Sequence, residues 1–155
     1  MNAPLPAELL ANPLLREWDT PFGLPPFADF SAADFAPALA LALKLHREEI
    51  DAIAAATDAS TFDNTIAAFD RSGRLISRIE AVFSNLTASH SSPELQVVER
   101  EMAAPLAAHG NAIYMHMPLF KRVDALHEQR HSLGLDAKQT RLLERIHLDF
   151  VQADA

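Results

Sequence analysis

The five residues from His127 to His131 read HEQRH, which is the strongest chemical motif in this sequence. On an α-helix, two histidines four residues apart lie on the same face and can bind one Zn²⁺ ion. A glutamate directly after the first histidine can then act as general base toward a water bound to that metal. The pattern is therefore typical of a metal-dependent hydrolase, with His127 and His131 as ligands and Glu128 as the base.

The residues around this motif argue against a zinc site. Gly134 lies where the longer HExxHxxGxxH pattern has its glycine, but Ala137 occupies the position of the third ligand. The nearby carboxylates Asp136 and Glu144 are out of that register, and Arg130 would place a positive charge beside the metal. We therefore predict no catalytic, cofactor-binding or metal-binding residue and no cofactor in this chain. A minimal zinc hydrolase using the HEQRH residues is retained as an alternative.

The other histidines are interpreted as structural. His46 and His109 fall within the apolar stripes of expected helices, where a histidine is usually hydrogen-bonded in the core. Met115 and Met117 flank another histidine, but neighbouring positions of a helix point to different faces. Core packing, rather than soft-metal binding, is therefore expected for both methionines. The histidines that lack a second ligand three or four residues further along the same helix are His90, His116 and His147.

The composition favours an all-α fold. The chain of 155 residues contains 28 Ala and 21 Leu, whereas Val, Ile and Thr together number 18. Ala and Leu lose little entropy in a helix, while β-branched residues are enriched in strands. With 49% hydrophobic and 22% charged residues, the chain is expected to form a folded core. The absence of cysteine fits a cytoplasmic location, which is our expectation.

The charge distribution limits the expected partners. The net charge is −8, and all of it comes from residues 1–70, which hold 3 basic and 11 acidic residues. Such a surface repels nucleic-acid phosphates and anionic membranes. No apolar run approaches the roughly 20 residues that a membrane span needs. We therefore expect neither a nucleic-acid partner nor a membrane partner.

The first 30 residues are expected to form an extended arm. Proline removes a backbone donor and restricts φ, so a proline-rich stretch does not continue as a helix. Apolar side chains are interleaved with these prolines, and we expect them to lie on the chain's own helices. The prolines are Pro4, Pro6, Pro13, Pro21, Pro25 and Pro26, and the apolar residues are Leu14, Leu15, Trp18, Phe22, Leu24, Phe27 and Phe30.

Residues 31–155 are expected to form a bundle of about five helices, of which the first three are long. Ser31, Thr61, Ser92 and Asp136 are residue types that begin helices, because their side chains accept hydrogen bonds from the first turn. Gly73 falls inside the second helix, where a close neighbouring backbone is the expected reason for it. The expected helices are 32–56, 62–89, 93–117, 118–133 and 137–152.

Several segments resemble the N-terminal region of the thimet oligopeptidase family of zinc metallopeptidases, most closely its peptidyl-dipeptidase (dipeptidyl carboxypeptidase) and oligopeptidase A branch. The resemblance covers nearly the whole chain. The matching segments are NPLL…W…TPFGLPPF (12–27), HREEIDAIAA (46–55), TFDNTIAAFDRSGRL (61–75), VFSNLTASHSSPELQVVEREMAAPLAAH (82–109) and SLGLDAKQTRLLERIHLDF (132–150).

This resemblance implies a non-catalytic part of a larger enzyme. In this family the zinc-binding motif lies in a downstream region that this chain does not contain. The resemblance therefore assigns a catalytic role to no residue of this sequence. The N-terminal portion forms a wall and roof of a channel that admits only short peptides. The implied partners are the downstream catalytic domain, which holds the zinc, and short peptides in the channel.

Two further expectations remain open. The alternative to a channel wall is an autonomous helical module that binds another protein. An exposed apolar face, either the arm from Leu14 to Phe30 or the residues Phe150 and Val151, would make the isolated chain a homodimer.

Overall fold

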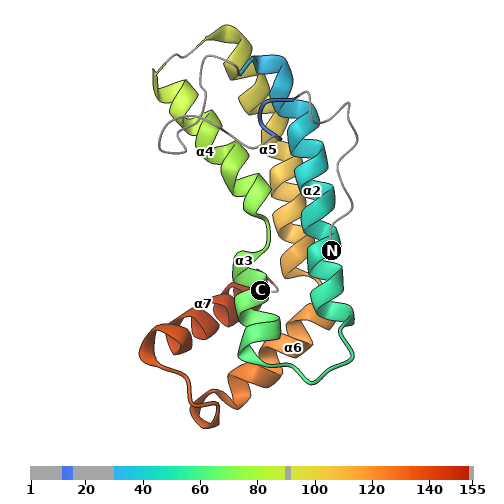
Figure 1. The fold of residues 1–155 in the computed structure, drawn as a ribbon, viewed down its shortest axis with the longest axis vertical. Helices are drawn as coiled ribbons and strands as arrows, with labels where there is room; N and C mark the ends of the chain where they lie inside the picture. The colour runs from blue at the N-terminus through green and yellow to red at the C-terminus, as the bar shows by residue number, and fades with distance from the viewer. Residues whose placement is uncertain (1–11, 16–29, 90–91, 154–155) are drawn as a thin grey trace. The chain divides into compact units, whose positions relative to one another are not determined.

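The computed structural model describes residues 12–15, 30–89 and 92–153, where all regular elements are helical and there is no strand (Figure 1). The expected all-α fold is confirmed. The helices are α2 (Ala32–Ala55), the π-helical segment η3 (Phe62–Ala67), α3 (Ala68–Arg71), α4 (Arg74–Ser89), α5 (Pro93–Tyr114), α6 (Met117–Glu128), the 3₁₀ segment η4 (Arg130–Ser132) and α7 (Ala137–Ala153).

The chain divides into two compact units, and both α2 and α5 contribute to each of them. The described residues of unit 1 are 12–15, 30–44, 73–89 and 92–106. Those of unit 2 are 45–72 and 107–153. None of the described helices is long and apolar enough to cross a membrane.

Side chains at the predicted positions begin the helices. The Thr61 hydroxyl accepts from Asn64 N, while the Asn64 side chain accepts from Thr61 N, so η3 begins with a complete capping box. Asp136 and Gln139 make the same reciprocal pair at the start of α7, at 2.8 and 3.0 Å. At the start of α2, the Asp34 carboxylate accepts from Ser31 N at 2.8 Å.

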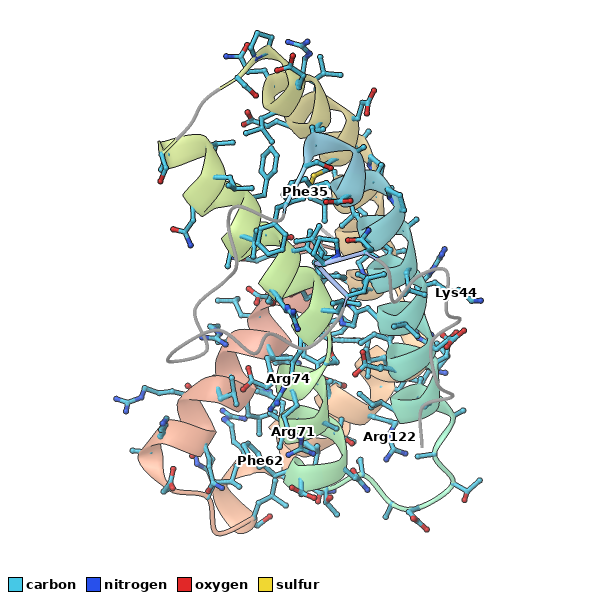
Figure 2. The ribbon with its side chains drawn as sticks, turned by 45° about the horizontal axis from the view of Figure 1, so that its top comes forward. Phe35, Lys44, Phe62, Arg71, Arg74 and Arg122 are labelled. Atoms are coloured by element: carbon cyan, nitrogen blue, oxygen red, sulfur yellow. The ribbon has the colours of Figure 1, made fainter. Side chains whose placement is uncertain are left out.

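Unit 1 is held together by one apolar cluster from α2, α4 and α5. Phe35 on α2 is fully buried and meets the edge of Phe83 on α4, with ring centroids 5.1 Å apart (Figure 2). Leu14 and Leu15, two of the five described arm residues, are buried in the same cluster. The remaining buried members are Ala38, Leu39, Ala42, Ile76, Ile79, Val82, Leu95, Val98 and Met102.

Unit 2 has a separate apolar cluster. Phe150 of α7 lies at its centre, in contact with the rings of Phe69, Tyr114 and Phe120. The helices α6 and α7 supply most of the other buried side chains, at the three- and four-residue spacings that the sequence predicts. The buried members besides Phe150 are Ile50, Ile66, Ile113, Leu119, Val123, Leu126, Leu143 and Ile146.

The predicted helix 62–89 is interrupted, which corrects the sequence interpretation. The chain leaves α3 at Arg71, turns at Ser72 and Gly73, and enters α4 at Arg74. Gly73 has φ +73°, a left-handed conformation that glycine adopts without steric cost. The reason for this glycine is therefore the turn between two helices, and not the close neighbouring backbone that we expected.

Two other expected boundaries change. The expected helix 118–133 ends at Glu128, because a 3₁₀ segment and a turn with Gly134 at φ +69° follow. The helix expected to reach residue 117 ends at Tyr114. Most of the expected arm, 1–11 and 16–29, lies outside the described residues, so the division into an arm and a helical domain stays a prediction.

Replacing Gly134 by alanine is expected to lower the free energy of unfolding by about 1 kcal/mol, because an L-residue is strained at φ +69°. A Cβ at this position would meet no atom within 4 Å, so the loss isolates the backbone effect. Urea denaturation measures it. Gly110→Ala is the matched control: this position lies inside α5 with equally open space, and alanine there should stabilise by about 0.5–1 kcal/mol. A destabilising Gly110→Ala, or a neutral Gly134→Ala, would contradict the assigned conformations.

Candidate functional site

The HEQRH residues do not share one helical face. His127 lies in the last turn of α6, Glu128 is the final residue of that helix, and His131 lies in the following 3₁₀ segment. Glu128 and His131 are exposed. The geometry that would place two histidines over one zinc ion is therefore absent from this segment.

His127 instead stacks on His147 of α7. The two imidazole rings are parallel, at an angle of 2°, with centroids 3.7 Å apart. The Nε2 atom of His147 lies 2.9 Å from a carboxylate oxygen of Asp124. Burial lowers the pKa of His127, and the charges of His147 and Arg130 lower it further against the opposing effect of Asp124 and Glu144.

Arg130 reinforces this arrangement by joining α6 to α7. Its guanidinium donates to the carbonyl oxygen of His127 at 2.7 Å and lies 3.6 Å from the Glu144 carboxylate. Glu144, the carboxylate that the sequence places out of register for a third ligand, is thus paired with a cation. Across residues 12–15, 30–89 and 92–153, no three His, Asp or Glu side chains are grouped to hold a metal ion.

A second group of polar side chains lies in unit 2 between α2, α5 and the turn after α3. His46 Nδ1 lies 2.8 Å from His109 Nε2, and His46 Nε2 lies 2.9 Å from Ser72 Oγ. Both histidines are half-buried, and burial lowers the pKa of each below the ordinary value of 6.5. The expectation that they are hydrogen-bonded is confirmed, but the sequence did not indicate that they bond to each other.

The serine–histidine–histidine order resembles a nucleophile with its base and an orienting residue. The direction of the hydrogen bonds argues against that chemistry. The Ser72 hydroxyl has one proton, and it donates this proton to the carbonyl oxygen of Phe69 at 2.5 Å. The Ser72 oxygen must therefore accept from His46 Nε2–H, so His46 is not placed to remove a proton from Ser72.

His116 joins two helices. Its Nδ1 accepts from Leu119 N and begins α6, while its Nε2 lies 3.1 Å from the Asp51 carboxylate of α2. The flanking Met115 and Met117 are 66% and 55% exposed, so the prediction that they pack in the core was wrong. They fall at the break between α5 and α6, where helical periodicity stops. His90 lies outside the described residues.

Arg122 of α6 holds the segment that follows α2, a role that sequence patterns did not indicate. Its Nη1 donates to the carbonyl oxygens of Ala56 and Asp58, both at 3.0 Å, and its Nη2 reaches Asn64 Oδ1 at 3.4 Å (Figure 2). The same Asn64 oxygen accepts from Thr61 N. The guanidinium therefore connects the end of α2, the loop and the start of η3.

The apolar surfaces that were expected to be exposed are described only in part, because residues 16–29 of the arm lie outside the described residues. Leu14, Leu15 and Phe150 are buried in the two cores, so these three side chains are not available to a second chain. Val151 is 45% exposed, as expected from its place at the end of the apolar pattern. The other exposed large apolar side chains in the described ranges are Val97, Met115, Met117 and Leu148.

Comparison with known proteins shows where similar sequences occur. The chain is 42% identical over 144 residues to the dipeptidyl carboxypeptidase of Salmonella typhimurium and 40% identical to that of Escherichia coli. It is also 27% identical over 141 residues to oligopeptidase A of Escherichia coli. The chain is therefore similar to part of each of these three proteins. No protein-family profile matches it.

The family similarity covers almost all of this chain but a small part of each relative. The aligned residues are 93% of the chain and 21% of either dipeptidyl carboxypeptidase. The chain therefore spans about a fifth of the length of the curated relatives it matches. The resemblance inferred from the sequence is confirmed, and the chain is similar to part of a peptidase.

Proposed function

We propose that the chain is the non-catalytic, N-terminal helical part of a cytoplasmic peptidase of the dipeptidyl carboxypeptidase type. The observation that carries this proposal is the alignment, in which 93% of the chain matches 21% of a peptidase at 42% identity. The geometry of the HEQRH segment supports it, because α6 ends at Glu128 and His127 is engaged by His147. Zinc and the groups that cleave the peptide bond would come from the rest of the polypeptide.

The role of this part would be steric. Helices joined by short turns and filled by apolar cores form a stiff wall, which can restrict a channel to short, unfolded peptides. In this proposal the chain's partners are the catalytic region of the same polypeptide and the short peptides that pass along the wall. Self-association of the isolated chain remains a further proposal, with Leu148 and Val151 as the exposed apolar residues on α7.

The isolated chain, supplied with Zn²⁺, is expected not to release dipeptides from the carboxyl end of short peptides. A chimera in which this chain replaces the matching segment of the Escherichia coli dipeptidyl carboxypeptidase is expected to retain that activity. Mass spectrometry of the peptide products measures both. Zinc-dependent cleavage by the isolated chain that is lost in His127→Ala would contradict the proposal in favour of a minimal hydrolase.

A separate experiment with two substrates tests the steric role. The same peptide is offered to the chimera free in solution and as a tail held against a folded domain. The chimera should cleave the free peptide and spare the held one. Equal cleavage of both would contradict the steric role while leaving the assignment to a peptidase intact.

A further inference from the structure

We propose that His46, His109 and Ser72 form a proton-operated latch in unit 2, which holds α2, α5 and the turn at Ser72 together while at least one of the two histidines is neutral and releases them when both are protonated. This inference is independent of the peptidase proposal. It rests on the two short contacts of His46, at 2.8 Å to His109 and 2.9 Å to Ser72.

The hydrogen bonds determine the tautomer of each member. Because the Ser72 proton goes to the carbonyl oxygen of Phe69, His46 must carry its hydrogen on Nε2 and donate it to Ser72. A neutral imidazole with hydrogen on Nε2 has a bare Nδ1, so His109 Nε2–H donates to it. The order is therefore His109 to His46, His46 to Ser72, and Ser72 to Phe69, with every proton assigned.

The two histidines of the latch share their first added proton. A proton added to Nδ1 of His109 leaves its Nε2–H bond to His46 in place, and a proton added to Nδ1 of His46 is donated to His109 Nε2 once the neutral His109 carries its hydrogen on Nδ1. When both rings are protonated, two N–H groups face each other across 2.8 Å, which is repulsive, and the contact must open. Protonation of both His46 and His109 is thus the event that releases the latch.

The surrounding charges support a neutral His46. Burial lowers the pKa of His46, and burial with the charges of His46 and Arg47 lowers the pKa of His109. On the side of the turn, Asp70 lies 4.0 Å from Arg145, and Arg71 lies 3.8 Å from Asp63. Those carboxylates are paired with cations of their own and do not neutralise an imidazolium at position 46.

The latch lies where the chain passes between the two units. The chain passes between the two units at residues 44–45, 72–73 and 106–107, and His46, Ser72 and His109 each lie within three residues of one such point. The latch therefore ties together the three points of unit 2 at which the chain continues into or out of unit 1. Opening the latch frees these points from one another inside unit 2.

The sign of the pH effect follows from linkage. An unfolded histidine titrates near 6.5, whereas folded His46 titrates lower, so between these values the folded state binds fewer protons. Stability of the latched segments is therefore fully present above about pH 6.5 and is lost as the pH falls through the folded pKa. One such proton changes the opening equilibrium by at most about tenfold per pH unit.

The test is NMR on the full chain with ¹⁵N-labelled histidine between pH 8 and 5. We expect His46 to show hydrogen on Nε2 at pH 8 and to titrate below 6.5. Hydrogen-exchange protection of the amides at 46–50 and 109–113, corrected for intrinsic rates, should fall by about tenfold over the same interval. A His46 with hydrogen on Nδ1, or one that titrates at or above 6.5, would overturn the proposal.

Variants separate the latch from general acid sensitivity. His46→Gln keeps hydrogen-bonding capacity without a titrating group, so the pH-dependent loss of protection at 109–113 should disappear. His131→Gln is the matched control, because His131 is exposed and outside the latch, and it should retain that loss. An unchanged pH response in a folded His46→Gln would overturn the latch, and if that variant does not fold, the tautomer and titration of the unmodified chain decide.

Discussion

Replacing Phe150 with alanine is expected to lower the free energy of unfolding by about 3–5 kcal/mol, enough to remove most of the stability of a small helical unit. Phe150 is 1% exposed, and its ring centroid lies 5.1 Å from Tyr114, 5.8 Å from Phe120 and 5.9 Å from Phe69. Its removal loses the transfer free energy of a buried ring and leaves a cavity that three other aromatic rings border.

Urea denaturation followed by circular dichroism measures this loss, and hydrogen exchange in α6 and α7 localises it to unit 2. Val151→Ala is the control, because the neighbouring side chain is 45% exposed and its truncation should change stability by no more than about 0.5 kcal/mol. Equal effects of the two substitutions would contradict the burial of Phe150 and the orientation of α7.

Replacing Arg122 with lysine is expected to lower the free energy of unfolding by about 1–2 kcal/mol, although the charge is kept. One guanidinium nitrogen donates to two carbonyl oxygens at 3.0 Å, and another reaches Asn64. An ammonium group on a flexible stem does not reproduce that planar arrangement. The carbonyls of Ala56 and Asp58 are near solvent, so water replaces part of the loss and the effect stays below that of Phe150→Ala.

Hydrogen exchange provides the specific readout for Arg122. Protection should fall in residues 56–65, which the guanidinium holds, and should be unchanged within α7. Lys121→Met is the control at the neighbouring exposed position and should leave both stability and exchange unaltered. If Arg122→Lys changed exchange uniformly along the chain, the local role assigned to this side chain would be wrong.

Sequence reasoning predicted the helical fold because the information is local. The Thr61, Ser92 and Asp136 side chains each accept from a backbone N–H at the start of a helix, as their types indicate. The apolar spacing likewise placed Leu39, Ile50 and other core residues correctly. The resemblance to a peptidase family was also present in the residues themselves, and the comparisons confirmed it.

The helix ends that were misplaced depend on backbone conformation, which residue type indicates only weakly. Gly73 takes a positive φ, yet a glycine within an apolar stripe is equally typical of a tolerated helix position. The interpretation of the HExxH pattern depended in the same way on where the helix ends. Once α6 ends at Glu128, the spacing of His127 and His131 no longer defines one face.

The sequence by itself determined the all-α fold, the positions at which most helices begin and the relationship to a peptidase family, since each depends on neighbouring residues or on similarity along the chain. Only the tertiary structure decided which polar side chains meet. His46 and His109 are 63 residues apart, and Arg122 is 66 residues from Ala56. Such pairs form because the packing of separate helices brings them within hydrogen-bonding distance, which no local pattern encodes.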